Sequence, residues 1–234
     1  MRKFQLFIKR AFDLVVSIML LLFLIAIPVM IVVPILIKLT SKGPAVFTQE
    51  RMGKDGKVFK IYKFRTMRIP EDSLDENGNM LEPKQRITKL GAFLRKTSID
   101  ELMQIFNIIN GTMSFVGPRP TLPYQAERYN DRQKKRHDMR PGITGWAQVN
   151  GRNDLTWSEK LEYDVEYIEK FSIGFDIKIM FKTVAVVFKQ DGIAFTKDDA
   201  INAKAPAKAE EATVGTSPEA QDAASAEEIV NTEK

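Results

Sequence analysis

The chain contains no cysteine and a single histidine, His137, among its 234 residues. Without cysteine it has no disulfide, no thiolate nucleophile and no cysteine-based zinc site. One histidine leaves one imidazole for acid–base catalysis, and no sequence motif pairs it with another catalytic residue. We therefore interpret His137 as a polar residue of a charged segment. Any chemistry must rest mainly on Asp, Glu, Lys and Arg, side chains that suit a bound hard cation.

Two common nucleotide-binding signatures are also missing. There is no G-x-x-x-x-G-K-[ST] and no G-x-G-x-x-G, which argues against a P-loop or Rossmann nucleotide site. The basic run "RQKKRHDMR" has no RNA- or DNA-binding motif beside it. The net charge of +5 and the pI near 9.2 therefore indicate phosphates or anionic lipid as partners, and no nucleic acid.

One long apolar run lies near the N-terminus, from Leu14 to Ile37, with 24 residues and no charge. As a straight helix it would measure about 36 Å, enough to cross a hydrocarbon core of about 30 Å. Pro28 interrupts it near the middle and favours a kink. Basic residues flank both ends, so both ends favour the cytoplasmic side. A kinked, re-entrant helix pair meets both demands, and a plain transmembrane helix is the alternative.

The stretch "LRKTSIDELMQIFNIING" has apolar residues at helical spacing. Ser98 and Glu101 form the S-x-x-E pattern of a capping box, and Asp100 would lie in the first turn, where the helix dipole favours an anion. Gly111 is a plausible end for the helix. The same position suits chemistry, because a helix N-terminus keeps a carboxylate ionised and binds phosphate. Asp100 is thus a candidate nucleophile, and Glu101 could assist by proton handling or metal binding.

Two loops rich in proline and glycine each carry an arginine, Arg119 in "GPRP" and Arg152 in "NGR". A guanidinium on a rigid loop suits phosphate recognition, because it offers a planar fork of donors. A structural ion pair is the alternative for Arg119. The remaining expected elements are a β-hairpin at 45–67 and helices at 86–95, 124–139, 158–170 and 175–189. The last of these is basic and amphipathic, and lies in a membrane interface or packs on the core.

Taken together, the motifs resemble the monotopic phosphoglycosyl transferases, also called bacterial sugar transferases. The similar stretches are "KRAFDL", "VFTQERMG", "FKIYKFRTM", "LRKTSIDELMQIFNIINGTMSFVGPRP", "RHDMRPGITGWAQVNGR" and "YDVEYI…DIKIMFKT", in this order over roughly residues 7–193. The chain looks most like the short single-domain members, such as the undecaprenyl-phosphate bacillosaminyl-phosphate transferase. The family's re-entrant helix breaks at a Ser-Pro pair, whereas this chain has Ile27-Pro28.

The resemblance implies transfer of a sugar 1-phosphate from a UDP-sugar to a polyprenyl phosphate, usually undecaprenyl phosphate, with release of UMP. It implies Asp100 as the nucleophile that carries the phospho-sugar, with Glu101 beside it and Mg²⁺ held by this pair. Further family residues are carried over as substrate-binding residues: Lys63, Arg95, Arg119, Arg152 and Asp164.

The resemblance also implies a monotopic protein at the cytoplasmic face of the bacterial inner membrane, in contact with membrane lipids. The expected fold is α+β and mostly α, with a re-entrant membrane helix, a β-hairpin and a compact helical catalytic domain with amphipathic interfacial helices. Residues 1–40 would anchor the chain, 41–195 would form the catalytic domain, and 202–234 would be a disordered acidic Ala/Glu-rich tail. The alternative function is a non-catalytic membrane-surface scaffold that binds anionic lipid or partner proteins.

Overall fold

The computed structural model describes residues 2–26, 28–151 and 155–189. Arg152 and the expected acidic tail at 202–234 lie outside the described residues. The chain divides into two units, 1–196 and 197–234, of which only the first contains described residues.

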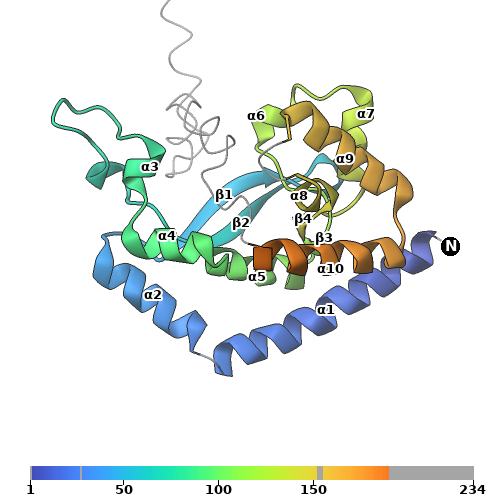
Figure 1. Cartoon of the computed structure of the whole chain (residues 1–234), viewed down its shortest axis with the longest axis horizontal. Coiled ribbons are helices and arrows are strands. Elements are labelled where there is room, and N and C mark those ends of the chain that lie inside the picture. The colour runs from blue at the N-terminus through green and yellow to red at the C-terminus, as the bar shows by residue number, and fades with distance from the viewer. Residues whose placement is uncertain (1, 27, 152–154, 190–234) are drawn as a thin grey trace, which may run out of the picture. The chain divides into compact units, whose positions relative to one another are not determined.

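The described residues are mostly helical, with two small two-stranded sheets (Figure 1). In chain order the elements are α1 (Arg2–Ala26), α2 (Val29–Thr40), β1 (Val46–Met52), η1 (Lys54–Gly56), β2 (Val58–Phe64), η2 (Pro70–Asp72), α3 (Pro83–Arg86), α4 (Lys89–Lys96), η3 (Ile99–Gln104), α5 (Ile105–Ile109), β3 (Ser114–Val116), α6 (Pro123–Ala126), α7 (Asp131–Lys134), η4 (Lys135–Asp138), β4 (Gly142–Thr144), α8 (Trp146–Val149), α9 (Trp157–Lys170) and α10 (Ile173–Lys189). The α+β, mostly α, class expected from the sequence is confirmed.

The expected β-hairpin is confirmed, with β1 and β2 antiparallel and Val46 opposite Phe64. The pairing continues without a break to Met52 opposite Val58. Ile61 and Phe64 of β2 are buried. Phe64 packs with apolar residues of α2 and α4, so the hairpin supports elements on both sides of it in the sequence.

The apolar N-terminal run forms two helices, α1 and α2, that meet at Pro28 and bend by 60° (Figure 1). No single helix within the described residues is both long and apolar enough to cross a bilayer. The two helices reach that length and composition only when they are taken together. Pro34 lies inside α2 without ending it, so the break follows the first proline of the run.

Several polar side chains of α1 attach this helix to the rest of the described chain. Arg10 donates to the carbonyls of Ile108 (2.5 Å) and Ile109 (2.9 Å) at the C-terminal end of α5. Lys9 forms a buried ion pair with Asp176 of α10 at 2.5 Å. Asp13 accepts a long hydrogen bond from the backbone N–H of Phe115, at 3.4 Å. Lys9, Arg10 and Asp13 of the apolar helix therefore face protein, not the exposed side.

Two expectations for the second half of the chain are wrong. The single charged helix at 124–139 is instead α6, α7 and η4, because Asn130 takes an extended conformation and caps a new helix by accepting from Gln133 N at 2.9 Å. The two Gly/Pro loops also contain β3 and β4, a short parallel pair. Gly117 permits this approach, since a Cβ there would lie 2.3 Å from the carbonyl oxygen of Arg140.

Candidate active site

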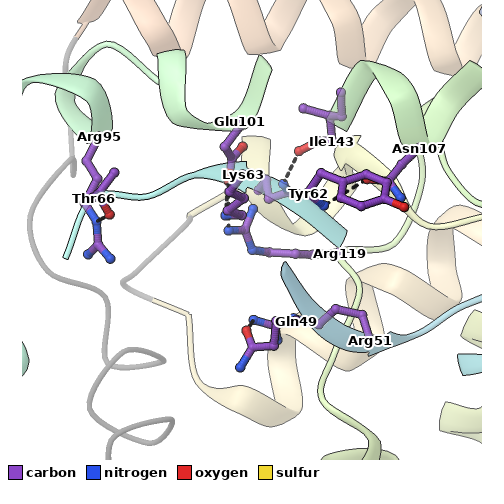
Figure 2. Close-up of polar contacts among 11 residues, drawn as sticks. Gln49, Arg51, Tyr62, Lys63, Thr66, Arg95, Glu101, Asn107, Arg119 and Ile143 are labelled. Carbon is purple, nitrogen blue, oxygen red and sulfur yellow. Dashed lines mark hydrogen bonds and ion pairs between the residues drawn. The ribbon is translucent and has the colours of Figure 1, made fainter. Parts of the chain in front are cut away.

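A cluster of one carboxylate and two cations joins η3, β2 and the loop after β3. The Glu101 carboxylate accepts from Lys63 Nζ at 2.8 Å and from Arg119 Nη2 at 3.3 Å, through the same oxygen. Figure 2 shows both cationic side chains converging on Glu101. Burial disfavours the charged form of Glu101, but Lys63 and Arg119 outweigh it and hold the pKa at about 2. Glu101 is therefore ionised at every physiological pH.

Asp100 lies beside this cluster in a different environment. It is 8% exposed, and within the described chain no hydrogen bond or ion pair reaches its carboxylate. Burial raises its pKa to about 6, and the Glu101 charge adds to this, against the opposing attraction of Lys63, Arg95 and Arg119. The result is a carboxylate that is mostly ionised at neutral pH but poorly solvated. Such a group is a stronger nucleophile than one in water or in an ion pair.

The local backbone differs from the expected capped α-helix. Ile99–Gln104 is a 3₁₀-helix, and Ser98 has a left-handed conformation with φ 56° and makes no side-chain capping bond. The capping box is therefore absent, because Glu101 turns to Lys63 and Arg119 instead of back to Ser98. A serine at positive φ costs about 1 kcal/mol or more, a strain that recurs at functional sites. Gly111, with φ 86°, follows the end of α5, as expected.

Asn107 fixes the position of Lys63 relative to Glu101. This side chain is fully buried, and its Oδ1 accepts from Tyr62 N at 3.0 Å while its Nδ2 donates to Lys60 O at 2.8 Å. Both bonds go to the free edge of β2, on either side of Ile61. They hold α5, and η3 before it, in register with the strand that carries Lys63 (Figure 2).

Arg95 reaches the site by way of a close approach between α4 and the end of β2. A Cβ at Gly91 would lie 1.9 Å from the Thr66 carbonyl oxygen, so only glycine permits this packing. Arg95 Nε then donates to Thr66 Oγ1 at 2.9 Å. Arg95 is close enough to Asp100 to lower its pKa, which places it at the same site as Lys63 and Arg119.

Asp164 supports the loop of Arg119 indirectly, through Arg136. It pairs with Arg136 at 2.6 Å, and the two side chains are 4% and 3% exposed. Arg136 also donates to the carbonyl of Arg119 at 2.6 Å, and to Tyr129 and Thr121. This gives Asp164 a positioning role that the sequence does not reveal, and its direct contact with substrate stays a prediction. Arg152, also expected at the site, lies outside the described residues.

Two residues at the site were not singled out from the sequence. Arg51 of β1 and Gln104, at the end of η3, line a small pocket together with Lys63 and Arg119. Ile61, Pro120 and Gly142 complete its wall. Gln104 follows Glu101 by three residues, and in a 3₁₀-helix side chains at this spacing lie directly one above the other. Arg51 could have been found from its place on the first strand of the hairpin, opposite Phe59.

The donor set suits Mg²⁺ bound jointly with a substrate. Among the described residues no group of three or more His, Asp or Glu side chains is arranged to hold a metal ion by itself. Asp100 and Glu101 nevertheless supply two adjacent carboxylates, and that of Asp100 has no partner within residues 2–26, 28–151 and 155–189. Mg²⁺ commonly binds one or two carboxylates, with substrate phosphates and waters as its other ligands.

The buried pair yields a prediction. Asp164→Asn leaves the Arg136 guanidinium buried without its counter-charge, so we expect the free energy of unfolding to fall by about 3 kcal/mol. The Arg119 loop should shift, and activity that depends on Arg119 should fall with it. Asp131→Asn, which removes an exposed ion pair to Lys134, serves as the control and should leave thermal unfolding unchanged. If Asp164→Asn has normal stability but a raised KM for the expected UDP-sugar, Asp164 contacts the substrate directly instead.

Comparison with known proteins assigns the family. Residues 4–190 match the model of the bacterial sugar transferases. The chain is 44% identical to the uncharacterized sugar transferase EpsL of Bacillus subtilis, over 81% of this chain and 91% of that protein. It is 44% identical to the UDP-glucose:undecaprenyl-phosphate glucose-1-phosphate transferase of Escherichia coli, and 41% identical to the undecaprenyl-phosphate galactose phosphotransferase of Salmonella typhimurium.

These matches cover 76% and 80% of this chain but only 39% and 41% of the two longer proteins. The family match extends over Lys63, Asp100, Glu101 and Arg119. The chain belongs to the bacterial sugar transferase family.

Proposed function

We propose that this protein transfers a sugar 1-phosphate from a UDP-sugar to undecaprenyl phosphate or a related polyprenyl phosphate, by way of a covalent intermediate on Asp100. The observation that carries the proposal is the contrast between the two adjacent carboxylates. Glu101 is neutralised by Lys63 and Arg119, whereas Asp100 is buried and has no recorded partner in the described chain. The names of the relatives, which include UDP-glucose and undecaprenyl phosphate, support the two substrates.

The reaction takes place in two displacements at one phosphorus atom. A carboxylate oxygen of Asp100 attacks the phosphorus that bears the sugar. The bond from this phosphorus to the bridging oxygen breaks, and UMP leaves with that oxygen and the electron pair. A phosphate oxygen of the polyprenyl phosphate then attacks the same phosphorus. The bond to Asp100 breaks, the carboxylate is restored, and a polyprenyl diphosphate sugar is formed.

The cations around Asp100 account for substrate binding and for the charge that develops on the leaving group. Lys63, Arg95 and Arg119 each lower the pKa of Asp100, so their charges act at the point of attack. The same fields would attract the diphosphate of the donor and stabilise the departing phosphate. Bound Mg²⁺, held by Asp100 and Glu101 with the diphosphate, would neutralise phosphate charge.

The N-terminal helix pair would enter one leaflet and return, which keeps the site at the cytoplasmic surface. Large apolar side chains of the pair are exposed: Val15, Ile18, Met19, Leu22, Phe23, Ile31, Val32, Ile35 and Leu39. Ile177, Phe181 and Val184 of α10 are exposed as well. These faces have no protein partner in the described chain, and acyl chains would cover them. A lipid phosphate and a water-soluble donor could then reach one site in turn.

The nucleophile assignment predicts a specific loss. Purified membrane protein should release UMP from a suitable UDP-sugar when polyprenyl phosphate and Mg²⁺ are present. Asp100→Asn should abolish this release, because an amide oxygen cannot form the acyl phosphate. Asp75→Asn, in an exposed turn, is the matched control and should keep normal turnover. Near-normal turnover by Asp100→Asn would refute the assignment.

The same variant should be more stable than the natural protein, which separates loss of chemistry from loss of fold. Because burial raises the Asp100 pKa to about 6, ionisation opposes folding as pH rises from about 4 to about 6. At higher pH the cost is of the order of 1–3 kcal/mol. Asp100→Asn should therefore raise the melting temperature at about pH 8, with little gain at about pH 4.

The raised pKa also predicts the pH dependence of the first step. Asp100 attacks as the carboxylate, so kcat/KM for the UDP-sugar should fall as pH drops below about 6 and level off above it. Glu101, with a pKa of about 2, stays ionised over this range and adds no second transition. A flat profile between about pH 5 and pH 8 in the natural protein would contradict a nucleophile that titrates near 6.

The absence of cysteine allows a clean test of the helix pair. Lys3→Cys and Lys42→Cys place single thiols at exposed positions on either side of it. In a re-entrant arrangement both should react with a membrane-impermeant maleimide in inverted inner-membrane vesicles, and neither in intact spheroplasts. Reaction of one thiol in each preparation would show that the pair spans the membrane.

A further inference from the structure

We propose that Gln104 is a further substrate-binding residue, whose side-chain amide donates to the phosphate of the departing nucleotide. The inference rests on the proposed function and assigns a role within the same site. It starts from a buried polar group that the fold itself does not use.

The Gln104 side chain is an exception among the buried polar groups near the site. Gln104 is 2% exposed, and in the described part of the chain no hydrogen bond is recorded for its side-chain amide. Its neighbour Asn107 is equally buried but bonds to both Tyr62 and Lys60. Gln104 is not among the described side chains whose unpartnered polar atoms are fully buried, so its amide keeps the small exposure of the residue, which lines a pocket. An amide placed in this way can donate to a ligand in the pocket.

The position of Gln104 indicates which ligand this is. Its side chain lines the pocket formed with Arg51, Lys63 and Arg119. Because η3 is a 3₁₀-helix, Gln104 lies one turn beyond Glu101 on the same face. Lys63 and Arg119 thus border both the Glu101 carboxylate and the pocket. The pocket adjoins the reacting centre and has three cations and one amide in its wall.

The chemistry of this wall suits a phosphate more than a sugar. Lysine, arginine and amide N–H groups all donate hydrogen bonds to phosphate oxygens. The residues that line the pocket include no carboxylate that would repel a phosphate. Asp100 is not part of the wall. The phosphate under attack must lie against Asp100, so the second phosphate of the donor, one bridging oxygen away, falls in the pocket. This second phosphate leaves as part of UMP.

Steady-state kinetics of Gln104→Met test the proposal, because methionine keeps the volume and removes the amide. In a two-displacement reaction kcat/KM for each substrate reports its own half-reaction. We expect kcat/KM for the UDP-sugar to fall about tenfold, the loss of roughly one hydrogen bond. The inhibition constant of UMP should rise by a similar factor. The value of kcat/KM for polyprenyl phosphate should fall as well, because in-line attack opposite Asp100 places its phosphate where the UMP phosphate was. The melting temperature should not fall, since Gln104→Met removes no hydrogen bond within the described residues.

Two further variants make the outcome decisive. Gln104→Glu keeps the shape but exchanges a donor for a negative charge, so it should lose more activity toward the UDP-sugar than Gln104→Met. Gln133→Met, outside the pocket wall, is the matched control and should leave all constants unchanged. Normal donor kinetics in Gln104→Met, an unchanged inhibition constant of UMP, or an active Gln104→Glu would each overturn the proposal. If the natural protein releases no UMP from any UDP-sugar, the proposed function fails instead.

Discussion

The ion cluster of Glu101, Lys63 and Arg119 is the interaction on which the site depends. It joins the 3₁₀-helix of the carboxylates to β2 and to the loop after β3, through bonds of 2.8 Å and 3.3 Å to one oxygen. It also balances charge. Two carboxylates adjacent in sequence would repel each other in a buried place, and the two cations permit both to be ionised at neutral pH. One carboxylate is thereby paired, and its neighbour is left for chemistry.

The cluster is maintained by buried polar contacts that do not touch it. Asn107 aligns β2 with α5, and Arg136 with Asp164 supports the Arg119 loop from behind. Arg10 of α1 caps the end of α5, so the apolar N-terminal helix and the reactive segment are connected directly. This arrangement ties the position of α1 to that of the segment that carries Asp100.

The sequence predicts the parts of the fold that depend on local pattern. Alternating apolar residues and a Gly-containing turn define the hairpin, and Pro28 marks the break in the apolar run. The segment after Ser98 does not follow its local pattern. The sequence predicts a capping box, but Glu101 pairs with Lys63 and Arg119, which lie far away in the sequence, and the capping bond is not formed. The roles of Gln104 and Asp164 depend on a pocket wall and on a buried partner 28 residues away, neither of which is visible in local sequence.

Whether Asp100 carries the phospho-sugar can be measured by mass spectrometry of the protein incubated with Mg²⁺ and UDP-sugar, without polyprenyl phosphate. We expect a mass increase equal to one sugar phosphate, located on Asp100 after proteolysis, and lost when polyprenyl phosphate is added. An active preparation that never carries this adduct, or carries it on another residue, would show that Asp100 is not the nucleophile.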